Sequence, residues 1–268
     1  MPEPSRLNER SVCRVGAQGN GSPTFMLWGD SHAAALEPAV DRRAKDFNVS
    51  GWYVGYSRCP ALIGAAPIHR APDDHPCLLI ADTVFELIRR NHIKHVVLVS
   101  RWDSYIDGWD RGSSETKQDL TISFSSAHEL FTGERAFRLA LRETLRQLRA
   151  LDVDVWIVEQ VPPQLVDVPS ALAKAVAFGR DPALLQRPLK DVEERRRAAA
   201  IIFSEYLGSP GVSFIDPAQV FCPNNRPCQV AASGQALYSD GNHLSLFGAL
   251  WSQHMLDPFF NSLKASAP

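Results

Sequence analysis

Two short segments near opposite ends of the chain carry side chains that could do chemistry together. The first is GDSH, residues 29–32, which follows the apolar residues FMLW and precedes AAAL. The second is DGNH, residues 240–243, which precedes LSLFGALW. A serine hydroxyl becomes a nucleophile when a base removes its proton and a third group orients that base. Ser31, His243 and Asp240 are therefore the candidate nucleophile, base and orienting carboxylate.

These segments need elements that bring them together, and the hydrophobic pattern predicts such elements. Short apolar runs predict strands at 24–29, 50–56, 94–100, 154–161 and 212–215. Apolar residues at helical spacing predict helices around 81–88, 137–148, 195–207 and 247–255. Alternating strands and helices favour a parallel sheet covered on both faces, which binds ligands at the carboxyl ends of its strands. Ser31 follows the first of these strands directly, at such an end.

Two long segments interrupt the alternation. We expect residues 103–126 to form a long polar loop and residues 162–190, which contain five prolines, to form an irregular insertion. The first 20 residues contain few apolar side chains and are predicted to be a linker. Residues 21–268 are then one catalytic domain, with no repeat or change of composition to mark a second.

The composition is that of an ordinary globular protein, with 45% hydrophobic and 22% charged residues and a net charge of −2. This charge gives no sign of binding to nucleic acid or to an anionic membrane. No apolar run has the length of a membrane span, and the first residues lack the apolar core of a signal peptide.

The cysteines lie in positions typical of structural disulfides. Cys222 and Cys228 bracket the turn-forming residues PNNRP, and Cys59 and Cys77 bracket a second proline-rich loop. We expect both pairs to form disulfides, which places the protein in an oxidising compartment. The alternative is five free thiols in a cytosolic protein. Cys13 has no assigned partner.

The two polar segments resemble the motifs of the SGNH/GDSL family of serine hydrolases and acyltransferases. The longer strings LWGDSHAAAL and YSDGNHLSLFGA look closest to the extracytoplasmic SGNH domains that are fused to membrane acyltransferase family 3 domains. This resemblance implies a three-layer α/β/α, flavodoxin-like fold with a central parallel sheet. It assigns Ser31 as nucleophile, His243 as general base and acid, and Asp240 as its orienting partner.

The resemblance also implies a function. It predicts an O-acyltransferase that moves an acyl group, expected to be acetyl, through an acyl-serine to a carbohydrate hydroxyl of a bacterial cell-surface polysaccharide. If water takes the place of the carbohydrate, the same residues give an acetyl esterase. No cofactor is implied, because a membrane acyltransferase domain on the same full-length chain delivers the acyl donor. The expected location is the periplasmic or extracytoplasmic face of the bacterial inner membrane.

The oxyanion hole departs from the family's pattern. The backbone amide of Ser31 is one expected donor, and the family normally adds a glycine after the second strand and an asparagine after the third. The segment VVLVSRWDSY has no asparagine, so Arg101 or an amide near it is the candidate replacement. Arg101 could equally bind substrate or pair with a carboxylate. Gly55 and Gly64 both remain candidates for the glycine.

Other residues near the predicted site have two interpretations each. Asp30 is expected to cap the turn or the following helix rather than to act as an acid. His32 is either a substrate contact or a packed histidine. Trp102, Tyr105 and Trp109 either stack on sugar rings or pack the long loop onto the domain.

Two other classes of function compete. Asp30-x-His32 and Asn242-His243 also resemble two motifs of the calcineurin-like, metal-dependent phosphoesterases. Against this, Leu244 stands where that family usually has an acidic residue, and its remaining ligand motifs are absent, so no metal site is predicted. The missing asparagine motivates the second competitor, a non-catalytic glycan-binding domain.

Overall fold

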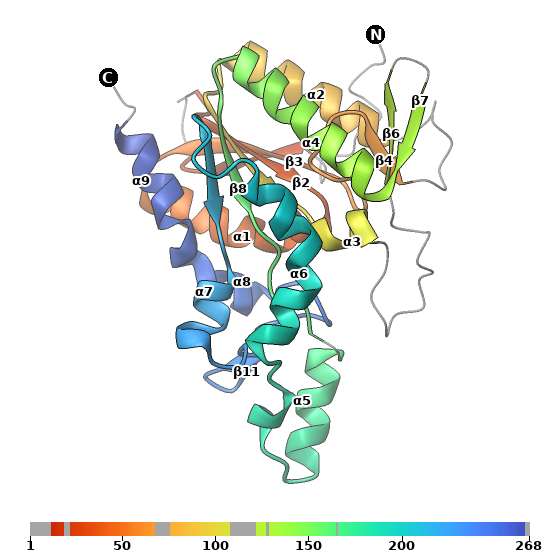
Figure 1. Cartoon of the computed structure of the whole chain (residues 1–268). Coiled ribbons are helices and arrows are strands. Elements are labelled where there is room, and N and C mark those ends of the chain that lie inside the picture. The colour runs from red at the N-terminus through yellow and green to blue at the C-terminus, as the bar shows by residue number, and fades with distance from the viewer. Residues whose placement is uncertain are drawn as a thin grey trace.

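The computed structural model describes residues 12–18, 22–67, 76–107, 122–126, 129–164 and 166–265. A six-stranded sheet in the order β1-β3-β2-β5-β8-β9 lies between two layers of helices (Figure 1). Its strands are β1 (Val12–Gly16), β2 (Phe25–Gly29), β3 (Ser50–Gly55), β5 (His95–Val99), β8 (Asp154–Val158) and β9 (Val212–Ile215). All neighbours are parallel except β1, which is antiparallel to β3. The parallel part has the flavodoxin-like order, so the predicted fold class is confirmed.

The strands at the centre of the sheet are apolar because helices cover both of their faces. Every residue of β2 and of β5 is buried, as expected for parallel strands inside an α/β domain. The chain turns in opposite directions from β2, toward β3 on one side and β5 on the other. A crevice forms at such a switch point, outside the carboxyl ends of the strands. Gly29, at the end of β2, lies in register with Gly55 of β3 and Val99 of β5.

The two helical layers enclose two hydrophobic cores, one on each face of the sheet. One core packs around Trp28, Trp102 and Phe137, and the other around Phe25 and Phe260. The helices of the first layer are α2 (Pro76–Asn91), α3 (Trp102–Asp107), α4 (Gly133–Ala150) and α6 (Leu189–Ser204). Those of the second are α1 (Ser31–Asp46), α8 (Leu246–Ser252) and α9 (Asp257–Ala265).

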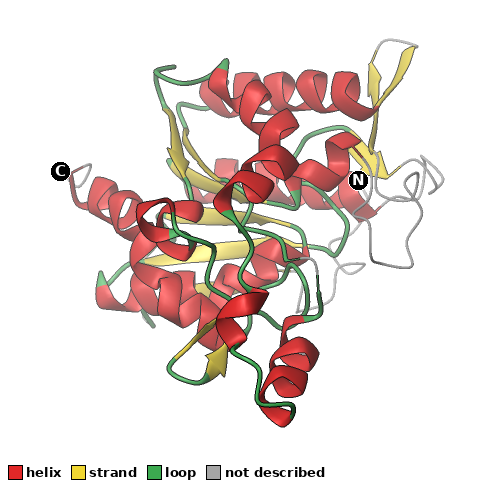
Figure 2. Cartoon of the chain, turned by 60° about the horizontal axis from the view of Figure 1, so that its bottom comes forward, coloured by secondary structure: helices red, strands yellow, loops and turns green. Residues whose placement is uncertain are grey.

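Smaller elements lie around this framework (Figure 2). They include a three-stranded sheet of β4 (Ala65–Pro67), β6 (Ile122–Ser126) and β7 (Glu129–Thr132), and a hairpin of β10 (Ala231–Ala232) and β11 (Gln235–Ala236). The remaining helices are α5 (Val168–Ala177), α7 (Ala218–Phe221) and the 3₁₀ turns η3 (Pro182–Leu185), η4 (Pro223–Asn225) and η5 (Gln253–Leu256). None of the strands of these two smaller sheets was predicted, because they lack the apolar runs that mark strands such as β2 and β5.

Three predictions about organisation need correction. The segment predicted as a linker, residues 1–20, contains β1, so residues 12–16 belong to the sheet; their backbone pairs with the otherwise free edge of β3. The predicted irregular insertion at 162–190 contains α5 and η3. The predicted polar loop at 103–126 includes most of α3 and ends in β6. Residues 108–121, which include Trp109, lie outside the described part of the chain.

Candidate active site

Ser31 is the first residue of α1 and follows β2 after a single residue, Asp30. Asp30 caps the helix, since its Oδ1 accepts a hydrogen bond of 2.8 Å from the amide of His32. The residue before it has to be glycine, because a Cβ on Gly29 would lie 1.8 Å from the carbonyl oxygen of Val99 and 2.6 Å from the Cβ of Ala33. The tight turn therefore sets the serine at a helix N-terminus, where amide groups and the helix dipole favour negative charge.

Asp240 and His243 form a second tight turn, which is closed by the carboxylate. Oδ1 of Asp240 accepts 2.7 Å hydrogen bonds from the amides of Asn242 and His243, and Oδ2 lies 2.7 Å from Nδ1 of His243. Partial burial would raise the pKa of the Asp240 carboxyl, but these hydrogen bonds outweigh it and hold the pKa well below its usual value. The ionised carboxylate thus orients the imidazole and fixes the proton on Nδ1.

The two turns meet although 212 residues separate them in the chain. Nε2 of His243 lies 2.8 Å from Oγ of Ser31, so with Nδ1 protonated it accepts the serine proton. The loop after β8 supports the second turn: the amide of Gln164 donates to the carbonyl of Gly241 at 2.6 Å, and that of Val168 donates to Asp240 at 3.3 Å. Ser31, His243 and Asp240 therefore form one continuous chain of hydrogen bonds.

Asp30 is a structural carboxylate, as predicted from its position. It is 1% exposed, and its Oδ2 accepts hydrogen bonds from the Tyr105 hydroxyl at 2.7 Å and the Arg101 amide at 2.9 Å. Burial raises the pKa of the carboxyl, and the hydrogen bonds from Arg101, Tyr105 and His32 oppose that rise. Asp30 therefore ties the loop after β5 to the turn that carries Ser31.

His32 does not line the pocket beside Ser31. Of its two predicted roles, the structure supports the packed histidine and not the contact with substrate. The side chain is 5% exposed, and its Nε2 lies 3.1 Å from Oδ1 of Asn242. Its ring packs against that of His243, with centroids 4.6 Å apart. Burial, followed by the nearby His243 and Arg101, lowers its pKa well below the usual value. His32 is thus a neutral, packed histidine that links the two turns.

A pocket of about 210 Å³ opens beside the serine. Its lining residues are Asp30, Ser31, Ser57, Arg58, Arg101, Ser104, Tyr105 and His243. Arg101 thus lies where the sequence predicted, and its buried Nε has no hydrogen-bond partner in the described structure.

Neither candidate glycine lines this pocket, and neighbours in the chain do so instead. Gly55 packs against the carbonyl of Gly29, and Gly64 lies against the ring of Phe124. Ser57 and Arg58, which were not predicted from the sequence, follow β3 and reach the pocket. Their place directly after a predicted strand, at the carboxyl edge of the sheet, was the signal that could have found them.

Trp102 is a core residue, so its predicted contact with substrate is wrong. It is 0% exposed, lies edge-on to Phe137 and Phe203, and donates from Nε1 to the carbonyl of Val158 at 2.8 Å. Helix α3 has two sides here: it buries Trp102 in the core and presents Tyr105 to the pocket. Nothing in the sequence distinguished these two aromatic residues.

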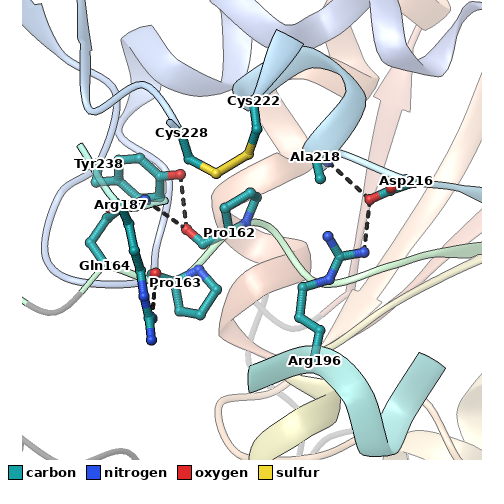
Figure 3. The surroundings of a disulfide bond; sticks show 10 residues. All are labelled: Pro162, Pro163, Gln164, Arg187, Arg196, Asp216, Ala218, Cys222, Cys228 and Tyr238. Carbon is teal, nitrogen blue, oxygen red and sulfur yellow. Dashed lines mark hydrogen bonds and ion pairs between the residues drawn. A yellow bond between two sulfur atoms is a disulfide. The ribbon is translucent and has the colours of Figure 1, made fainter. Parts of the chain in front are cut away.

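Both predicted disulfides are confirmed: Cys59 is bonded to Cys77 and Cys222 to Cys228, while Cys13 is a half-buried free thiol. The second disulfide lies beside the loop that supports the His243 turn (Figure 3). There the carbonyl of Pro162 accepts hydrogen bonds of 3.0 Å from the Tyr238 hydroxyl and from Nε2 of Gln164.

The described residues contain no group of three or more His, Cys, Asp or Glu side chains placed to hold a metal ion. Within the same residues, no helix combines the length and the apolar character needed to cross a bilayer.

A Ser–His–Asp chain at the carboxyl edge of a parallel sheet is the arrangement used by serine-dependent hydrolases and acyltransferases with α/β folds. The chain belongs to the family of SGNH domains fused to AT3 domains, whose family model matches residues 2–258. The predicted resemblance to this family is therefore confirmed.

Similar solved structures include one with a TM-score above 0.5, which supports the fold. The periplasmic domain of a lipopolysaccharide acetyltransferase from Salmonella ser. Paratyphi A superposes with a TM-score of 0.60 and 16% identity, over 91% of this chain and 85% of that one. A putative acylhydrolase from Bacteroides fragilis NCTC 9343 matches with a TM-score of 0.45 and 12% identity, over 92% and 90% of the two chains. A putative platelet activating factor from Streptococcus pneumonia matches with a TM-score of 0.45 and 11% identity, over 90% and 85%. No curated protein matches the sequence.

Proposed function

We propose that this domain is a serine-dependent O-acyltransferase that carries an acyl group, expected to be acetyl, on Ser31 and transfers it to a carbohydrate hydroxyl. The observation that carries the proposal is the 2.8 Å contact between Ser31 Oγ and His243 Nε2, on a histidine held by Asp240. Membership of the SGNH family supports an enzyme of this type.

The first half of the reaction loads the serine. Oγ of Ser31 attacks the carbonyl carbon of the acyl donor while its proton passes to Nε2 of His243. Asp240 stabilises the imidazolium that forms. The carbon–oxygen bond to the leaving group then breaks, and His243 returns the proton to the departing oxygen. Acyl-Ser31 remains.

The second half reverses these steps with a new nucleophile. A hydroxyl of the carbohydrate gives its proton to His243 and attacks the acyl-serine, and Ser31 leaves with that proton. If water attacks in its place, the product is the free acid, so esterase activity follows from the same groups. The oxyanion of each tetrahedral intermediate is stabilised by the Ser31 amide at the start of α1 and by Arg101.

The acyl donor and its route come from the family context. Fusion to AT3 domains supports a membrane acyltransferase domain on the same full-length chain, which supplies acyl groups. The two disulfides support a location in an oxidising compartment, the periplasmic or extracytoplasmic face of the inner membrane. The carbohydrate acceptor, a bacterial surface polysaccharide, is proposed on the same family context.

A fluorophosphonate probe and a small acetyl ester together test this function. We expect the probe to modify Ser31 in the folded protein, and Ser31→Ala and His243→Ala each to reduce hydrolysis of p-nitrophenyl acetate to near background. Thermal unfolding would check that both variants remain folded. A protein that is folded but neither labelled nor active would contradict the proposal and would support the alternative of a non-catalytic glycan-binding domain.

A further inference from the structure

The segment that supports the His243 turn continues into a small lobe, residues 168–187, made of α5, η3 and the turn between them. Figures 1 and 2 show α5 projecting away from the sheet, beyond the other helices. The base of the lobe touches the candidate active site, because the amide of Val168 donates to the carbonyl of Asp240. The lobe therefore lies on the side of the sheet that carries the Ser31 pocket, at the carboxyl ends of the strands.

The outer surface of the lobe is apolar. Leu184, Phe178 and Val176 are 79%, 74% and 71% exposed, more than any other large hydrophobic side chain of the described residues. All three fall within nine positions of one another. Single exposed apolar residues are normal on a protein surface, but a concentration of this kind on one projection marks a contact surface.

The exposure is a property of a well-formed lobe. Val168 is buried, and Leu172 and Leu185 pack against the core around Phe25 and Phe260. These apolar contacts hold the lobe against the rest of the domain. Asp167 caps α5 by accepting from the amide of Ser170, and Asp181 caps η3 by accepting from that of Ala183. The apolar tip is thus presented on a stable support.

Two cations and one anion accompany the apolar tip. Lys174, Arg180 and Asp181 are exposed, so cations are in excess, and the Arg180 guanidinium lies 5.9 Å from the centre of the Phe178 ring. The chain as a whole carries a net charge of −2, so a general attraction to an anionic surface is not expected. A projecting apolar tip with neighbouring cations fits the interface of an anionic bilayer, where the rings and aliphatic groups enter the headgroup region and the cations meet lipid phosphates.

We propose that residues 168–187 dock this domain on the surface of an anionic lipid bilayer, with the candidate active site close to that surface. The inference rests on the proposed function, in which the acyl group arrives from a membrane domain on the same chain. A tip of three large side chains gives weak and reversible binding. Weak binding suffices there, because a tether to the membrane raises the effective concentration of lipid.

Flotation with vesicles of phosphatidylcholine and phosphatidylglycerol tests the proposal on the chain of 268 residues. We expect the wild type to bind, and Val176→Ser/Phe178→Ser/Leu184→Ser to bind at least about tenfold more weakly, because transfer of apolar surface drives insertion. The matched control, Leu130→Ser/Ile201→Ser/Leu207→Ser, also removes three exposed apolar side chains, outside the lobe. It should bind as the wild type does.

The charge requirement gives a second comparison. Lys174→Gln/Arg180→Gln should weaken binding to vesicles that contain phosphatidylglycerol, and added salt should weaken wild-type binding in the same way. Equal binding by the wild type and the triple lobe variant would overturn the proposal. Failure of the wild type to bind vesicles would also overturn it, and would favour a protein contact for the lobe.

Hydrolysis of p-nitrophenyl acetate without vesicles separates this inference from the proposed function. The triple lobe variant should retain wild-type hydrolysis, since none of its three residues lines the pocket. A wild type that binds vesicles but does not hydrolyse the ester would overturn the proposed function and leave the lipid contact standing.

Discussion

The imidazole rings of His32 and His243 lie against each other, with centroids 4.6 Å apart and ring planes inclined by 42°. His32 also reaches Oδ1 of Asn242, the residue before His243. One histidine thus belongs to the serine turn and the other to the histidine turn, and their contact joins the two. Because burial keeps His32 neutral, it adds no positive charge beside a His243 imidazolium.

Loss of this contact should loosen the position of His243. We expect His32→Ala and Asn242→Ala each to lower kcat for acetyl-ester hydrolysis by about 10- to 100-fold, because small displacements of a catalytic base are costly. The two effects should not add in the double variant, since both remove the same link. His254→Ala, on a side chain that is 71% exposed, is the matched control and should leave kcat unchanged. Additive losses would argue against a shared role.

Arg101 is expected to act on the oxyanion. Its side chain lines the Ser31 pocket, and its buried Nε has no partner in the described structure. Arg101→Ala should lower kcat by about 10²–10³-fold with a smaller change in KM, as for the loss of one oxyanion donor. Arg42→Ala, which removes an exposed arginine of α1, should have no effect. An effect of Arg101→Ala on KM alone would assign Arg101 to substrate binding.

Gly29 is expected to tolerate no side chain. An alanine Cβ would overlap the Val99 carbonyl, at 1.8 Å, so Gly29→Ala should lower the free energy of unfolding by about 3 kcal/mol or more. Gly234 has open space around it but a φ of +76°, so Gly234→Ala should cost only about 1 kcal/mol. Urea unfolding compares the two variants, and equal losses would contradict the steric explanation.

The disulfide between Cys59 and Cys77 should stabilise both the fold and the pocket. It closes a separation of 18 residues directly beside Arg58, which lines the pocket. Cys59→Ser/Cys77→Ser should lower the free energy of unfolding by about 3 kcal/mol and reduce activity. Cys13→Ser, which removes the free thiol, is the control. A reductant should destabilise the control and the wild type, and should affect the double variant least.

Stability should depend on pH through Asp240. Its pKa is lower in the folded protein than in the unfolded chain, so folding favours the ionised form. That contribution is complete above the ordinary carboxyl pKa of about 4 and is lost as the pH falls toward the lower folded value. The difference in Tm between wild type and Asp240→Asn should therefore be largest at neutral pH and should shrink in acid. Asp82→Asn, on an exposed side chain of α2, should show no such trend.

The sequence by itself determined the main strands, the helices α2, α4, α6 and α8, and the family. Runs such as FMLWG and HVVLV are buried on both faces, so their apolar character needed no knowledge of neighbours. The motifs around Ser31 and Asp240 are local turns, each closed by its own carboxylate, and a local pattern carries that information. Only the tertiary structure decided how residues far apart in the chain meet. It placed Ser57 and Arg58 rather than Gly55 at the pocket, buried Trp102 in the core while the equally buried Tyr105 borders the pocket, and packed His32 on His243. These outcomes depend on how other elements pack around each residue. The short edge strand β1 likewise forms only because β3 offers it a partner. The periodicity of a single segment contains no information about either its neighbours or its partner strand.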